Sequence, residues 1–269
     1  AVINKNYQTG IKGHNCGHGV KHCAVCKHAK AIRQAATYST VPVDIYNSMQ
    51  LILSDVHGPL PTAFDGYRYI IHFTCFTTRF SFCYLMETRD QAAGCFADFI
   101  TKVHQLGFKV TDIVLKTDNA PEYVEGDLSD ICQSQGIQQQ VSAPYRHTNA
   151  AIAERLWRTI LAIIRSLLFA TSFGAPYWSL AVNHAFYLYN RRPHSFLEMT
   201  TPFENLFHIK PDLTHLRVWG CDAYAHIDEQ HRESKLTERS VHGIFIGFDT
   251  DNIARIFVPA TKKIIHRGD

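Results

Sequence analysis

Hydrophobic positions follow two rhythms along the chain from about residue 49. Short apolar runs rich in aromatic and β-branched residues predict strands, and apolar residues spaced three and four apart predict helices. We expect strands over residues 49–54, 67–76, 80–85, 110–116 and 137–141. We expect helices over residues 91–106, 128–135, from about 150, and from about 176 to 190. This order predicts an α/β layer whose first strands pair antiparallel and whose later strands are joined by crossovers.

Both ends of the chain differ from this middle part. After Pro211, short apolar runs separated by turns predict strands over residues 216–227, 243–248, 253–258 and 262–266, which is a small all-β unit. Residues 1–40 hold four glycines, four histidines and three cysteines with little apolar periodicity, so this segment needs something other than a core to hold it. We therefore divide the chain into residues 1–40, 41–210 and 211–269.

Composition narrows the class of protein. Of the 269 residues, 46% are hydrophobic and 19% charged, which excludes a disordered or collagen-like chain. No run approaches the roughly 18 uncharged apolar residues of a membrane span, and no secretory signal opens the chain, so we expect a soluble intracellular protein. Eight cysteines with a single close pair fit a reducing compartment. A net charge of +3 permits nucleic-acid binding without arguing for it.

Three carboxylates stand where oxygen ligands for a divalent cation could meet. Asp55 follows the first predicted strand, Asp118 follows the strand at 110–116, and Glu154 lies near the start of the long helix, off its apolar stripe. Mg²⁺ prefers such ligands, and two ions about 3.5–4 Å apart can activate an attacking oxygen and stabilise a leaving oxygen. Each residue also has a simpler interpretation: Asp55 and Asp118 as turn residues, and Glu154 as a partner of Arg158.

Motifs around these acids resemble the integrase of copia-type LTR retrotransposons, a part of their Pol polyprotein. The three acidic blocks are Ser54-Asp55 with Gly58-Pro59-Leu60, Lys116-Thr117-Asp118-Asn119, and Ala153-Glu154-Arg155. Further matches to the copia subtype lie at residues 189–194, 201–204, 215–221, 235–236 and 243–248. The resemblance extends from about residue 20 to the end of the chain.

This resemblance implies a ribonuclease H-like mixed sheet flanked by helices, with Asp55, Asp118 and Glu154 as catalytic ligands of Mg²⁺ or Mn²⁺. It implies trimming of the element's DNA 3′ ends by water and joining of the new 3′-hydroxyls to target DNA. The implied partners are the element's DNA ends, target DNA and further copies of the chain. Nuclear residence follows from a chromosomal substrate.

Cys23 and Cys26 have the spacing of half a zinc site. In the family such a pair closes a His-His-Cys-Cys module whose histidines would lie upstream of residue 1. Cys16, His14, His18 and His22 offer other ligands, but their glycine-rich spacing does not match. We therefore describe residues 1–40 as a remnant of a zinc module and Zn²⁺ as a possible second metal.

Several basic and polar side chains near the acidic blocks are candidates for contacts to DNA phosphates. These candidates are Lys116, Asn119, Arg146, Arg155 and Arg158, with His147 and Arg165 nearby. A solvated helix face explains each arginine equally well.

Departures from the family pattern cluster near the acids. Ala120-Pro121 replaces two glycines, Trp157 replaces an asparagine, and Cys75-Phe76 replaces an acidic pair. The loop before Glu154 carries Ala150-Ala151, which favour helix. These changes support a second hypothesis, a catalytically inactive nucleic-acid-binding module, drifted or retained by a host. A ribonuclease of the same fold is a third, and the C-terminal β unit argues against it.

Overall fold

The computed structural model of the chain describes residues 46–124, 126–141, 147–171, 173–227, 230, 232, 234 and 236–268, with the backbone alone at 147–151. The segment 1–40, with Cys23 and Cys26, lies outside the described residues, as does Arg146. None of the helices within the described residues combines the length and apolar character needed to cross a membrane.

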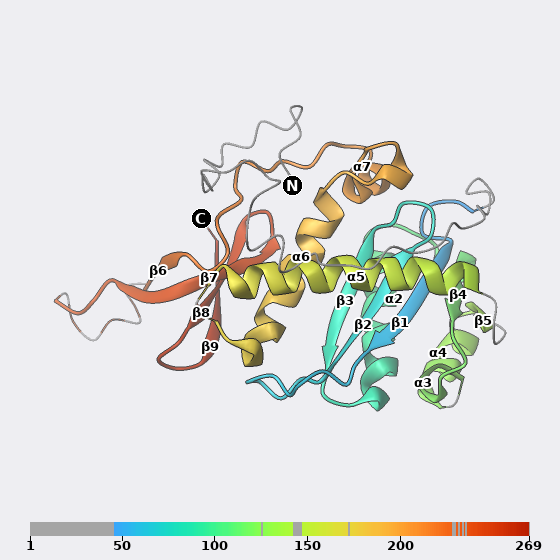
Figure 1. The fold of residues 1–269 in the computed structure, drawn as a ribbon, viewed down its shortest axis with the longest axis horizontal. Coiled ribbons are helices and arrows are strands. Elements are labelled where there is room, and N and C mark those ends of the chain that lie inside the picture. Colours follow the sequence, from blue (N-terminus) through green and yellow to red (C-terminus); the bar gives the residue numbers. More distant parts are fainter. Residues whose placement is uncertain are drawn as a thin grey trace.

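A five-stranded mixed sheet forms the larger part of the molecule (Figure 1). Its strands are β1 (Leu51–His57), β2 (Tyr69–Cys75), β3 (Ser81–Met86), β4 (Val114–Thr117) and β5 (Gln138–Val141). They lie in the order β3-β2-β1-β4-β5, with β1 to β3 antiparallel and β4 and β5 parallel to β1. The pairing expected from the sequence is therefore present.

Helices cover both faces of this sheet. Successive side chains of β2 point to opposite faces, so each face has apolar residues that a helix must cover. On one face, Phe73 packs against α2 (Ala92–Gln105), which contributes Phe96 and Phe99. Short helices α3 (Pro121–Val124) and α4 (Asp127–Ser134) complete this layer. On the other face, Ile70 packs with α5 (His147–Phe169) and α6 (Trp178–Arg191). A mixed sheet between helices fits the ribonuclease H-like fold expected.

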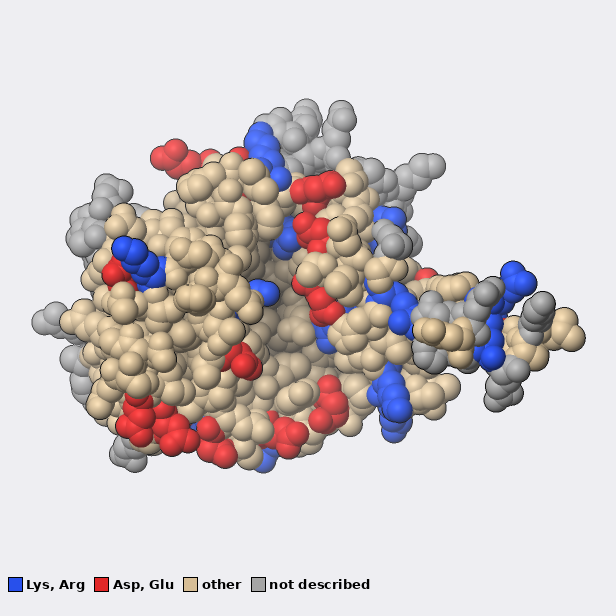
Figure 2. Space-filling view, turned by 180° about the vertical axis from the view of Figure 1, so that it is seen from behind, with Lys and Arg blue, Asp and Glu red and all other residues tan. Residues whose placement is uncertain are grey.

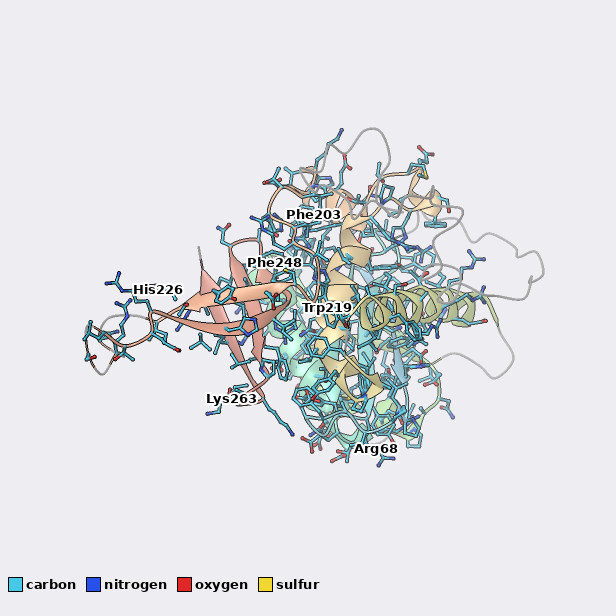
Figure 3. The ribbon with its side chains drawn as sticks, turned by 60° about the vertical axis from the view of Figure 1, so that its left-hand side comes forward. Arg68, Phe203, Trp219, His226, Phe248 and Lys263 are labelled. Carbon is cyan, nitrogen blue, oxygen red and sulfur yellow. The ribbon has the colours of Figure 1, made fainter. Side chains whose placement is uncertain are left out.

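A second, antiparallel sheet follows α7 (Pro202–Phe207). Its strands are β6 (Asp222–His226), β7 (Ser240–Thr250), β8 (Ile253–Val258) and β9 (Lys263–Gly268), in that order. Ile246 and Phe257 pack in one hydrophobic cluster with α5 and α6. Trp219 lies between this sheet and the helices, where its indole donates to the Ile246 carbonyl at 3.0 Å (Figure 3).

Some expected boundaries were wrong, for local reasons. The first strand does not end at Ser54 but runs to His57, because Val56 and His57 pair with β2. Residues 110–112 form a 3-10 turn, which leaves four residues in β4. Within 216–227 only β6 is a strand. Helix α7 was missed; the Thr201 hydroxyl accepts from the Glu204 amide at its start, with Pro202 in the first position.

Candidate active site

Asp55 and Asp118 lie at neighbouring positions because β1 and β4 are adjacent parallel strands. Leu53 pairs with Lys116; Asp55 lies two residues further along β1, and Asp118 directly follows the end of β4. Asp118 is exposed, and its Oδ1 accepts from the Ala120 amide at 3.1 Å. The sequence placed Asp55 after the strand, whereas it lies within β1. The structure brings these two predicted residues together.

Burial raises the pKa of Asp55, and the negative charge of Asp118 raises it further. The Trp157 indole N–H opposes this shift, since it donates to Asp55 Oδ2 at 2.9 Å. The Arg89 guanidinium also favours the carboxylate, more weakly. Asp55 is thus a partly desolvated carboxylate beside a second acid, an arrangement that functional sites use and structural ion pairs less often show.

Glu154 does not join the two aspartates. Its side chain is 63% exposed on α5, and its Oε1 accepts from Arg158 at 3.0 Å. Among the side chains that the structure describes, no group of three or more His, Cys, Asp or Glu could hold a metal ion. The simpler interpretation of Glu154, a pair four residues apart on a helix, describes its position here.

Trp157 is the residue that sequence reasoning did not assign to the site. It is buried, its ring stacks on His57 at a centroid distance of 4.8 Å, and the His72 ring lies edge-on to it at a centroid distance of 5.1 Å. Burial lowers the pKa of His57 and takes that of His72 to about 3, so both rings stay neutral at pH 7. The signal in the sequence was that Trp157 stands where the family pattern has an asparagine. The sequence did not show what the indole of Trp157 contacts.

Residues that support the two acids from behind follow Ala120-Pro121, another departure from the family pattern. Pro121 begins helix α3, where its missing N–H costs nothing. This helix buries Tyr123, whose hydroxyl lies 2.8 Å from Ser54 Oγ, directly before Asp55. Next to it, Glu122 forms an ion pair with Arg89. Pro121 is therefore accommodated at the first position of α3, and α3 in turn supports β1 through Tyr123.

The predicted DNA contacts are spread over two elements. Lys116 is half-buried in β4, Asn119 is exposed after it, and Arg155 is exposed on α5. Arg158 is engaged by Glu154. Figure 2, the face turned away from the viewer in Figure 1, shows acidic side chains along its lower edge and in a second group in its upper middle, with basic side chains more frequent toward its right-hand side.

Asp55 and Asp118 suit a divalent cation, because they offer carboxylate oxygens at one sheet edge, and Mg²⁺ fills its remaining positions with water. The fold and these two acids define an α/β protein with an acidic pair on adjacent parallel strands. Comparisons with known proteins place it more narrowly. A family model described as the retroviral polymerase SH3-like domain matches residues 221–269.

Two plant proteins match most of the chain. The retrovirus-related Pol polyprotein from transposon TNT 1-94 of Nicotiana tabacum is 31% identical over 94% of this chain and 19% of that protein. The Pol polyprotein from transposon RE2 of Arabidopsis thaliana is 29% identical over 87% of this chain and 16% of that protein. The chain is thus similar over most of its length to retrovirus-related Pol polyproteins of transposons, which confirms the resemblance expected from the sequence motifs. It spans about a fifth of the length of these relatives.

Among solved structures, the chain is similar to the catalytic core domain of BIV integrase. The TM-score is 0.44, with 18% identity over 60% of this chain and 95% of that chain.

Proposed function

We propose that this chain is the integrase segment of a retrotransposon Pol polyprotein and catalyses metal-dependent phosphodiester cleavage and transfer on DNA. The observation that supports this most is the pairing of Asp55 and Asp118 on adjacent parallel strands. The similarity to retrovirus-related Pol polyproteins supports the same activity. The substrate is then the element's DNA ends and a chromosomal target, which implies action in the nucleus by more than one copy of the chain.

In this proposal Asp55 and Asp118 would hold Mg²⁺ or Mn²⁺, which would supply charge stabilisation to the phosphodiester. Trp157 fixes one oxygen of Asp55, so the carboxylate keeps its orientation. Glu154 would add a third carboxylate only if it left Arg158, which would then be available to a DNA phosphate. Water first breaks a phosphodiester near each DNA 3′ end. The freed 3′-hydroxyl oxygen then forms a bond to a target phosphorus, and the bridging 3′ oxygen of the target strand leaves as that strand's new 3′-hydroxyl.

A second candidate is a DNA-binding module without catalysis. It is supported by the Glu154–Arg158 pair and by the indole on Asp55, because both occupy groups that the chemistry needs. Zinc binding by Cys23 and Cys26 stays a prediction under either function.

Strand resealing on a branched DNA that mimics the joined product separates the two candidates, since it needs little knowledge of the element's terminal sequence. We expect resealing with Mn²⁺ or Mg²⁺, lost at least 100-fold in Asp118→Asn. Glu154→Gln tests the third ligand, and Asp90→Asn serves as an exposed control. Salt-sensitive DNA binding with no resealing by the unaltered chain contradicts the enzyme and supports the binding module.

A further inference from the structure

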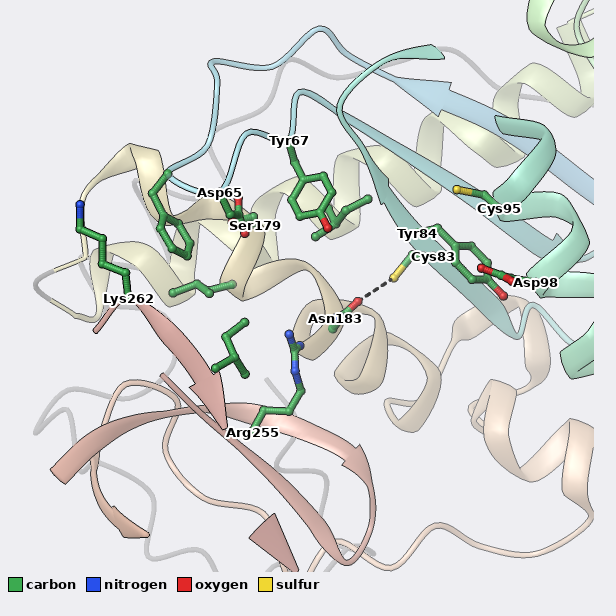
Figure 4. A pocket seen from close by; sticks show the side chains of 14 residues that line it. Asp65, Tyr67, Cys83, Tyr84, Cys95, Asp98, Ser179, Asn183, Arg255 and Lys262 are labelled. Atoms are coloured by element: carbon green, nitrogen blue, oxygen red, sulfur yellow. Dashed lines mark hydrogen bonds between the residues drawn. The ribbon is translucent and has the colours of Figure 1, made fainter. Parts of the chain in front are cut away.

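A pocket of about 530 Å³ lies between the two sheets, away from Asp55 and Asp118 (Figure 4). Its walls come from the loop before β2, from β3, from α2 and α6, and from β8 and β9 of the second sheet. This volume is that of a small-molecule site. Both polar and apolar side chains line it, and the site described above contributes none of them.

Arg255 is the most unusual group in this pocket. It reaches from β8 toward Asn183 on α6, and its side chain is 9% exposed (Figure 4). Its Nε and Nη1 atoms are buried and have no hydrogen-bond partner among the described residues, although Nε lies 3.5 Å from Asp249 Oδ1. Asp249 faces the Nε side only, so Nη1 is left without an acceptor, and an unpaired N–H on a buried guanidinium is costly unless an oxyanion reaches it.

The remaining lining limits which anion fits. Asp65 and Asp98 are acidic and Lys262 is basic, so with Arg255 the lining carries two groups of each sign. A polyanion would meet the two acids, whereas a head group with one negative charge meets a single guanidinium. Beside this polar end, Phe64, Tyr67 and Leu85 offer aromatic and apolar surface to a ligand body. Asn183 stands next to the guanidinium, and its Oδ1 accepts from Cys83 Sγ at 3.5 Å.

We propose that this pocket binds a small organic carboxylate, with its head group on the Arg255 guanidinium and a flat, partly apolar body against the aromatic side chains. The planar fork of arginine matches the two oxygens of a carboxylate. Because strands of both sheets line the pocket, such a ligand would contact both of them. The proposal stands apart from the transfer chemistry, because no wall of the pocket includes Asp55, Asp118 or Glu154.

Cysteine protection on the whole chain tests this directly. Cys95 lines the pocket and is partly buried, whereas Cys221 is partly buried outside it. We expect benzoate to slow alkylation of Cys95 at least fivefold, as measured by site-resolved mass spectrometry, with no change at Cys221. Benzyl alcohol, which lacks the charge, should not protect, and phenyl phosphate should require a higher concentration than benzoate.

Variants assign the effect to Arg255. Arg255→Lys keeps the charge, loses the fork, and should weaken benzoate protection at least tenfold, while Arg267→Gln on β9 should leave it unchanged. If Arg255→Lys does not fold, Asn183→Leu fills the head-group end from α6 and should remove protection as well. Equal protection by benzyl alcohol, tighter protection by phenyl phosphate, or full protection in a folded Arg255→Lys protein each overturns the proposal.

Discussion

Single side chains decide the state of the acidic pair. Asp55 carries a carboxylate that is partly withdrawn from water, faces another acid, and is held by one indole N–H from a helix 102 positions later in the chain. The sequence predicted Asp55 and Asp118 because acids beside predicted strands are visible in the residue pattern. It could not show the Trp157 contact, since that depends on how α5 lies across β1.

Asp55→Asn should make the protein more stable at neutral pH. Because the native pKa of Asp55 is raised above 3.8, the folded chain binds more protons than the unfolded chain between 3.8 and that higher pKa. Stability from this group is therefore present at low pH and lost as pH rises through the native pKa. Asparagine escapes this loss and still accepts from Trp157.

The expected gain at pH 7 is about 0.5–2 kcal/mol, the usual range of stabilising substitutions, and it should vanish below pH 3.8. Urea unfolding with EDTA at several pH values measures it. Exposed Asp90→Asn should change stability by less than about 0.5 kcal/mol. A variant less stable than the parent at pH 7 would falsify the desolvation argument.

Helices and strands with a clear repeat of apolar residues were predicted from the sequence. Short helices that begin at a proline were not. Helix α2 and strands β2 and β3 follow from apolar spacing. Helices α3 and α7 are four and six residues long and begin at prolines, so their apolar pattern is too short to read. The end of β1 also escaped prediction, because its last residues are held by pairing with β2 rather than by their own propensity.

Gly58 follows β1 and connects it to the loop before β2. Its φ is +139°, and a Cβ there would stand 2.7 Å from the Arg68 carbonyl oxygen and 2.7 Å from the Tyr69 ring. Gly58→Ala should therefore destabilise the protein by about 2–4 kcal/mol, since backbone strain and a clash act together. Denaturant unfolding measures the change.

Gly94 provides the matched control. It lies in α2, and nothing stands within 4 Å of its added Cβ. Gly94→Ala should stabilise by about 0.5–1 kcal/mol, because alanine loses less backbone entropy in a helix. Equal effects of the two substitutions would show that the close approach at Gly58 is unimportant.

At the scale of the whole molecule, the two sheets share one hydrophobic cluster. Ile246 and Phe257 of the second sheet pack with Ile160 and Ala181 of α5 and α6. A polar cluster reinforces this contact: Asp251 accepts from Arg191 at 2.7 Å and from the Tyr187 hydroxyl at 2.6 Å. The sequence predicted a change of pattern near residue 211 but not that the two parts share a core, because the packing partners lie far apart along the chain.

Asp251→Asn should weaken both parts together. It leaves Arg191, whose side chain is 10% exposed, without its charged partner, at a cost of about 1–3 kcal/mol. Tryptophan fluorescence and far-ultraviolet circular dichroism should then shift to the same lower urea midpoint. Asp222→Asn, on an exposed strand, is the control and should have little effect. Two separated transitions in the parent would contradict a shared core.

The shared core has a consequence for how copies of the gene decay. A premature stop codon between the codons for Trp219 and Ile246 removes Ile246 and Phe257, which pack against α5 and α6, and leaves Trp219 without the carbonyl that it contacts. Such a transcript yields a chain with an uncovered apolar face. A chain of this kind aggregates or is degraded in the cell. Amino-acid substitutions at Asp55 and Asp118 do not uncover this apolar face. Copies that still produce folded protein should therefore keep the codons through Phe257 intact, while they can carry changes at Asp55 and Asp118.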